Sequence, residues 1–228
     1  MNIGYFASAV TEEHELFLQA LNGRYLQMLS PGKAPSPIDI IDLNTDIRKT
    51  RDALRARVSD KADELVSSLG IAAETPSEEV VLRLLSEFKR SFALVTLKNV
   101  ADVVDAGRKG RDDLGRMFNR SMGAAMGELV MRKAQKIDFK VPDSAGRKWD
   151  ATRYMSFIAR EFVYRLKLAK QVSELLGDFA EVFYPDHDSD GMVFSVRGDH
   201  PGMPTYTELL PTVFHPNSKA EVRPHAFA

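Results

Sequence analysis

The sequence predicts a mainly α protein, with a multi-helix body, a small C-terminal β-hairpin region and an extended Pro-rich tail, α+β overall. Apolar residues recur every three or four positions through most of the first 176 residues, as in amphipathic helices. Gly and Pro signals interrupt this periodicity at intervals typical of helix ends. The last fifty residues change to short runs rich in Val and Phe between Pro and Gly, which favour strands and turns.

Composition excludes several classes of protein. The 228 residues contain 44% hydrophobic residues, enough for one substantial core or two small ones. The chain has no Cys, which excludes a disulfide framework, a thiolate metal site and a cysteine nucleophile. We find no signal-peptide pattern and no apolar run of membrane-spanning length, so synthesis in the cytoplasm is the expected default.

Two helical segments are expected before residue 70. The first covers about residues 5–29, as one helix or two short ones, and stops at Ser30-Pro31-Gly32. Prolines at positions 31, 35 and 37 predict a linker there. The second covers about residues 39–69, as one long or one broken helix, and stops at Gly70.

The clearest local signal is Thr75-Pro76-Ser77-Glu78, in which a threonine N-cap precedes a proline at the first helical position. A helix should begin at Pro76 and run to about Val104. The glycine-containing stretch 105–110 is then expected to break it, and a further helix should start near Asp112. We therefore expect an N-terminal helical region at 1–110 and a second domain at 111–228.

The second region combines a helix with short strands. A strand is expected at 137–141, followed by a turn at 142–146. Asp150 is a suitable N-cap for a helix that Gly177 should close. Two more strands are expected at 181–185 and 191–196, before a tail with little regular structure beyond Gly198.

Charge is unevenly distributed along the chain. Residues 131–170 carry 11 basic and 4 acidic side chains, whereas residues 171–228 carry 3 and 9. Such a basic segment suits a polyanion or an acidic protein surface, although an ordinary solvated face with Glu161 and Arg165 paired remains open. The candidate contact residues are Lys133, Lys136, Lys140, Arg147, Lys148, Arg153, Arg160 and Lys167.

The run from Asp186 to Gly191 alternates Asp with other residues, as calcium loops do. Such a loop needs a glutamate about six residues after its glycine, where Arg197 stands, so a solvated hairpin turn is the competing interpretation. A zinc or iron site of His187, His200 and His215 is conceivable but fits no standard spacing. No phosphate loop, dinucleotide fingerprint or nucleophile elbow is present, so we expect no enzyme and no cofactor.

An ordered series of short motifs over about residues 112–224 resembles the minor head proteins of tailed bacteriophages, the Mu protein F-like or phage minor capsid family. In that family a glycine-arginine-tryptophan turn leads into a helix, and a Gly-x-Val-Phe-Ser strand and a His-Pro tail follow. The motifs in this chain are Gly146-Arg147-Lys148-Trp149-Asp150, Tyr154-Met155, Arg160-Glu161, Asp190-Gly191-Met192-Val193-Phe194-Ser195-Val196, His200-Pro201 and Phe214-His215-Pro216-Asn217-Ser218.

The chain departs from the family where many members carry cysteines that look like a metal site. Ser218, Lys219 and Ala220 occupy the tail positions, and Phe183 and Asp186 stand where a Cys-x-x-Cys pair would fall. The resemblance therefore leaves Asp186, His187 and His215 only as candidate remnants of that site.

The resemblance implies a virion structural protein inside the phage head or at its head-tail vertex, and in the host cytoplasm during assembly. Its expected partners are the portal protein, capsid proteins and packaged DNA, in a multi-copy assembly without a membrane. Two other hypotheses stay open. One is a soluble helical nucleic-acid-binding module, and the other is a metal-dependent hydrolase using Asp186, His187, Asp190, His200 and His215.

Overall fold

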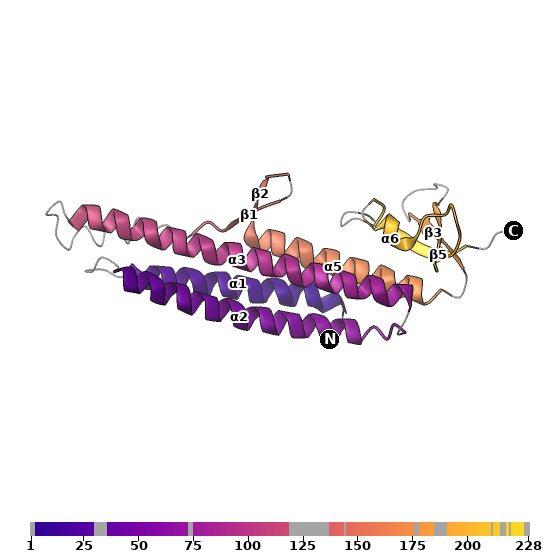
Figure 1. The fold of residues 1–228 in the computed structure, drawn as a ribbon, viewed down its shortest axis with the longest axis horizontal. Helices are drawn as coiled ribbons and strands as arrows, with labels where there is room; N and C mark the ends of the chain where they lie inside the picture. The colour runs from indigo at the N-terminus through magenta and orange to yellow at the C-terminus, as the bar shows by residue number, and fades with distance from the viewer. Residues whose placement is uncertain are drawn as a thin grey trace. The chain divides into compact units, whose positions relative to one another are not determined.

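The structure of the chain is a computed structural model. It describes residues 3–29, 36–72, 75–118, 137–143, 145–175, 178–184, 191–210, 212–214, 218 and 220–225. Five helices and two small antiparallel sheets lie within these ranges, which confirms the mainly α class with a small β component (Figure 1). None of the described helices is both long enough and apolar enough to cross a membrane.

Helices account for most of the described residues. They are α1 (Ile3–Met28), α2 (Pro37–Ser67), α3 (Pro76–Phe118), α5 (Ala151–Ser173) and the single turn α6 (Tyr206–Leu209). The strands are β1 (Lys140–Pro142), β2 (Lys148–Asp150), β3 (Phe179–Phe183), β4 (Val193–Ser195) and β5 (Glu221–Pro224).

Capping side chains fix where three of the helices begin. The expected start of α3 is confirmed, because the Glu78 amide donates to Thr75 Oγ1 at 3.2 Å. The Arg153 amide likewise donates to Asp150 Oδ1 at 3.0 Å at the start of α5. A third cap was not predicted: Ser36 and Asp39 bond each other's backbone amides around Pro37, so this proline begins α2.

The predicted break at residues 105–110 is wrong, because α3 continues through it to Phe118. The glycines there serve close packing. A Cβ at Gly107 would lie 3.1 Å from Met28 Cε, and one at Gly110 would lie 2.9 Å from Leu29 Cδ2. These glycines therefore admit neighbouring side chains against the helix instead of turning the chain.

The chain divides into two compact units, and each long helix contributes residues to both. The first, here called the sheet unit, comprises Met1–Ala7, Asp60–Arg90 and Phe157–Ala228. The second, here called the hairpin unit, comprises Ser8–Ser59 and Ser91–Ser156.

An aromatic cluster forms part of the core of the sheet unit. The rings of Phe88 and Phe162 stack with centroids 4.5 Å apart and planes at 12°. Phe6 meets the edge of Phe88 at 5.4 Å and lies 5.6 Å from Phe162. One residue from each of α1, α3 and α5 thus fills this position, and all three are almost fully buried.

The three-stranded sheet of the same unit has the order β4-β3-β5, with both pairs antiparallel. Ala180 and Val182 alternate with more exposed residues along β3, so one face of the strand is covered. Beyond Gly198, where little regular structure was expected, the tail contributes α6 and β5. Tyr164 and Tyr206 link α5 to the surrounding elements, because their hydroxyls donate to the backbone oxygens of Ala220 and Arg165.

In the hairpin unit, α1 and α2 run antiparallel side by side (Figure 1). Ion pairs between Glu13 and Arg57 and between Arg24 and Asp46 set their alignment. β1 and β2 form a hairpin with Val141 opposite Trp149. The Asn22 side chain accepts a hydrogen bond from the Ile137 amide at 3.1 Å, which connects α1 to the segment that leads into this hairpin.

Candidate functional site

The structure brings four of the eight predicted contact residues together. Lys140, Arg147, Lys148 and Arg153 belong to the β1–β2 hairpin and the first turn of α5, all within the hairpin unit. Arg160 and Lys167 are exposed on α5 in the sheet unit. Lys133 and Lys136 lie outside the described residues.

Asp143 organises the turn of the hairpin. Its Oδ1 accepts hydrogen bonds from the amides of Ala145 and Arg147 at 3.0 and 2.9 Å. Its Oδ2 accepts from Arg147 Nε at 2.7 Å and from Trp149 Nε1 at 2.9 Å. Gly146 has a φ of +77°, which closes the turn in a conformation suited to glycine.

The electrostatics of Asp143 follow from these bonds. The Trp149 indole N–H is the largest cause that holds the pKa of the Asp143 carboxyl at about 2, and the donors of Arg147 and Ala145 lower the pKa further. The carboxylate therefore stays ionised over the usual pH range and fixes the orientation of the Trp149 ring.

Two arginines lie close to the Trp149 ring. The guanidinium carbons of Arg147 and Arg153 are each 5.9 Å from the centroid of the indole, within the range of cation–π attraction. Arg147 reaches this position from the turn, and Arg153 from the first turn of α5. The sequence pattern predicted the basic residues, but it gave no indication that Trp149 would be their common support.

Carboxylates offset part of the positive charge of this basic hairpin. Asp143 pairs with Arg147 at 2.7 Å, and Asp138 pairs with Lys140 at 3.1 Å. Lys148 and Arg153 are exposed beside them. Exposed cations around a partly exposed indole can contact phosphates and stack on a base or a planar group, so the arrangement suits a polyanion such as single-stranded nucleic acid.

The predicted metal candidates are not tested by the structure. Asp186, His187, Asp190 and His215 lie outside the described residues. Within the described ranges, no three His, Asp or Glu side chains are grouped so as to hold a metal ion. His200 instead lies 4.4 Å from the Phe179 ring and 3.4 Å from Asp199 Oδ1.

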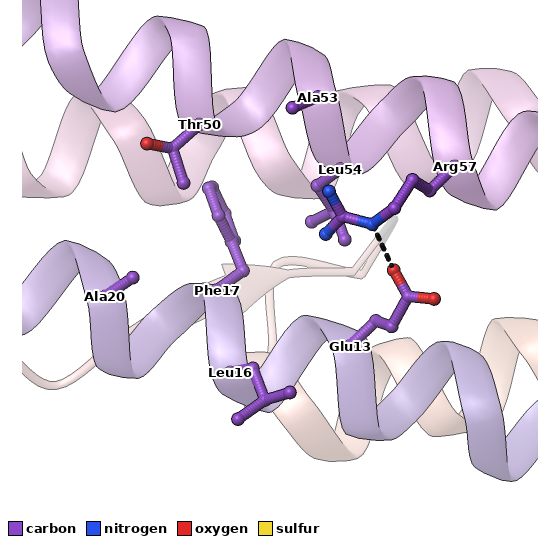
Figure 2. A pocket seen from close by; sticks show the side chains of 8 residues that line it. All are labelled: Glu13, Leu16, Phe17, Ala20, Thr50, Ala53, Leu54 and Arg57. Atoms are coloured by element: carbon purple, nitrogen blue, oxygen red, sulfur yellow. Dashed lines mark hydrogen bonds and ion pairs between the residues drawn. The ribbon is translucent and has the colours of Figure 1, made fainter.

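A surface groove between α1 and α2 was missed by the sequence analysis. It has a volume of about 580 Å³ and takes four residues from each helix, at spacings of three, four and seven. Figure 2 shows the ring of Phe17 directed toward α2 and the dashed Glu13–Arg57 ion pair at one end. The lining residues are Glu13, Leu16, Phe17, Ala20, Thr50, Ala53, Leu54 and Arg57.

A polar pair lies in the core of the hairpin unit. His14 and Asn99 are fully buried, with His14 Nε2 3.0 Å from Asn99 Oδ1. Burial is the main cause that lowers the pKa of His14 from 6.5 to about 4, against smaller opposing effects of Asn99 and Asp150. His14 is therefore neutral at neutral pH. Its Nδ1 and the amide nitrogen of Asn99 have no hydrogen-bond partner among the described residues.

Comparisons with known proteins add no assignment: no family model, no curated protein and no solved structure matches the chain.

Proposed function

We propose that this chain is a structural protein of a tailed-phage virion, a minor capsid or head morphogenesis protein at or near the portal. In that position it contributes to head assembly, to the head-tail connection or to DNA packaging and delivery. It is not an enzyme in this proposal. Its partners are portal or capsid subunits, and its basic hairpin contacts packaged DNA or an acidic surface of a neighbour.

The observation that carries the proposal is the way the motif Gly146-Arg147-Lys148-Trp149-Asp150 folds. Gly146 closes the turn, Arg147 and Trp149 bond Asp143, and Asp150 caps α5. Gly146, Arg147, Trp149 and Asp150 therefore hold the hairpin in the form that presents Arg147, Trp149 and Arg153 together, and the backbone of Lys148 belongs to β2 of the same hairpin. Lys148 is exposed beside that cluster, which supports a role in contact with a polyanion.

The virion role is tested by mass spectrometry of purified phage particles and by co-purification with the portal protein encoded by the same phage. We expect the chain in few copies per particle and in complex with the portal. Finding it only in producing cells, and never in particles, would overturn the virion role. Retained nucleic-acid binding in that case would favour the soluble binding module, because the basic hairpin would still explain it.

The contact made by the basic hairpin is tested separately. Single-stranded DNA binding by the full chain should weaken with salt, and Arg147→Ala, Lys148→Ala and Arg153→Ala together should lower the slope of log K against log salt by up to about 2, given about 0.7 per phosphate contact. The matched control replaces three exposed cations of the hairpin unit by alanine, namely Arg48, Arg55 and Arg108. Equal effects of the two triple variants would remove the specific role of the hairpin.

A further inference from the structure

The α1–α2 groove has an apolar floor and an exposed leucine on its rim. Phe17 and Leu54 are almost fully buried at its base, and Ala20 and Ala53 leave the space above them open. Leu16 of α1 also lines the groove and is 58% exposed (Figure 2). The groove therefore has room for an apolar side chain above its floor, and Leu16 is an apolar side chain that could enter such a groove.

The two ion pairs of the hairpin unit give the groove a self-complementary charge pattern. At one end α1 is acidic and α2 basic, with Glu13 and Arg57 3.0 Å apart. One turn beyond the other end the signs are reversed, with Arg24 and Asp46 3.3 Å apart. Arg57, Arg24 and Asp46 have side chains that are 58%, 53% and 49% exposed, so they can also meet charges from outside.

We propose that this groove binds a second copy of the same chain, related by a two-fold axis parallel to α1 and α2. Such an axis places α1 of each copy over α2 of the other without shifting it along the helices. Glu13 of one copy then lies over Arg57 of the other, and Arg24 lies over Asp46. Both contacts join opposite charges, and each occurs twice.

The same alignment places Leu16 in the opposite groove. Glu13 faces Arg57 within one chain, so Leu16, one turn along α1, stands level with Leu54 on α2. After the two-fold rotation, Leu16 of each copy lies over Ala53 and Leu54 of the other. The exposed Leu16 side chain thus packs against small residues of the opposite groove, as in knobs-into-holes packing. This interface involves neither the basic hairpin nor the proposed virion role.

Sedimentation velocity of the full chain over a concentration series tests the interface. We expect a monomer–dimer equilibrium that Leu16→Glu weakens at least about tenfold, because a buried leucine is replaced by a desolvated carboxylate. Leu94→Glu is the matched control, since Leu94 on α3 is also 58% exposed. Far-UV circular dichroism verifies that both variants stay folded. A chain that is monomeric throughout, or a dimer that Leu16→Glu leaves unchanged, would overturn the proposal.

A charge swap tests the symmetry itself. Arg24→Asp with Asp46→Arg keeps the ion pair within each chain and the net charge, so the swapped chain should still pair with itself. Mixed with an isotopically labelled wild-type chain at low salt, it should give few mixed dimers. Like charges would then face each other at both copies of the contact between positions 24 and 46, while the Glu13–Arg57 contacts are unchanged. Native mass spectrometry measures the mixed species. Mixed dimers at the random share of one half would contradict the assigned contacts.

Discussion

Helices α1 and α3 meet in both units of the molecule, but with different chemistry. In the sheet unit Phe6 and Phe88 meet edge to face, beside the stacked ring of Phe162 from α5. In the hairpin unit the contact is the hydrogen-bonded pair of His14 and Asn99. The first contact buries only apolar surface, whereas the second buries two polar side chains.

The two contacts contribute differently to the stability of the fold and to the alignment of α1 with α3. Aromatic rings gain free energy from burial and tolerate modest changes of packing partner. A buried imidazole and a buried amide gain little over hydration, yet each is costly when it has no partner. Sliding α1 by one turn along α3 would separate His14 from Asn99 inside the core. The polar pair therefore disfavours alternative alignments, and the aromatic cluster supplies more of the stability.

Truncating the aromatic cluster should have the largest effect. We expect Phe88→Ala to lower the free energy of unfolding by about 3–5 kcal/mol, because it removes a stacked ring and leaves a cavity. Urea denaturation followed by far-UV circular dichroism measures the loss. Leu82→Ala is the control on the same helix, since Leu82 is 54% exposed, and it should change stability by at most about 0.5 kcal/mol. A loss below about 1 kcal/mol for Phe88→Ala would refute the contrast drawn between the two cores.

Acidification should act on the hairpin unit through His14. The unfolded chain has a His14 pKa near 6.5, and the folded chain has one of about 4. Between these values the unfolded chain binds more protons, so the free energy of unfolding falls as the pH drops from 6.5 to 4, by about 3 kcal/mol at most.

Urea titrations at several pH values measure this dependence, and His14→Leu should remove its His14 component. The other histidines and the carboxylates give the background, which the wild type and the variant share. Identical pH profiles for the two proteins would show that His14 is not held neutral by the fold.

The helical body could be predicted from sequence because its signals are local. Thr75 and Asp150 cap helices through residues only three positions away, and the apolar period covers most of the core. Gly107 and Gly110 were misinterpreted because their partners, Met28 and Leu29, are far away in the sequence. Leu16 follows the same period as Phe17, yet only Phe17 is buried, because the position of α2 decides which side of α1 is covered.

The candidate site also combines features that the sequence predicts with features that depend on the folded structure. Its basic residues stand out in the sequence as a charge cluster. The approach of Arg147 and Arg153 to the Trp149 ring depends on the hydrogen bond from the indole to Asp143 and on the strand pairing, and neither can be derived from residue spacing. The groove between α1 and α2 also exists only after two helices are packed.

Removing one partner of the polar pair should cost less than removing an aromatic ring. We expect Asn99→Ala to destabilise by about 1–3 kcal/mol, because His14 stays buried without its hydrogen bond. Replacing both residues together, with His14→Leu and Asn99→Leu, should recover most of this loss. Neither variant side chain then leaves a buried polar group without a hydrogen-bond partner. The measurement is a double-mutant cycle in urea that compares His14→Leu, Asn99→Leu and the variant carrying both changes. Additive losses from the two single changes would argue against coupling between His14 and Asn99.

Glycine substitutions in the hairpin unit should have the smallest effects, and they test whether its helices are closely packed. A Cβ at Gly23 would meet no atom of another described segment within 4 Å, so Gly23→Ala should stabilise by about 0.5–1 kcal/mol through helix propensity. At Gly107 the added methyl would lie 3.1 Å from Met28 Cε and 3.4 Å from Ile40 Cδ1, and this crowding should cancel the same gain. Thermal unfolding of the two variants measures the difference. Equal stabilisation would mean that α3 has room at Gly107, and that close approach of its neighbours does not explain why the glycine is tolerated within the helix.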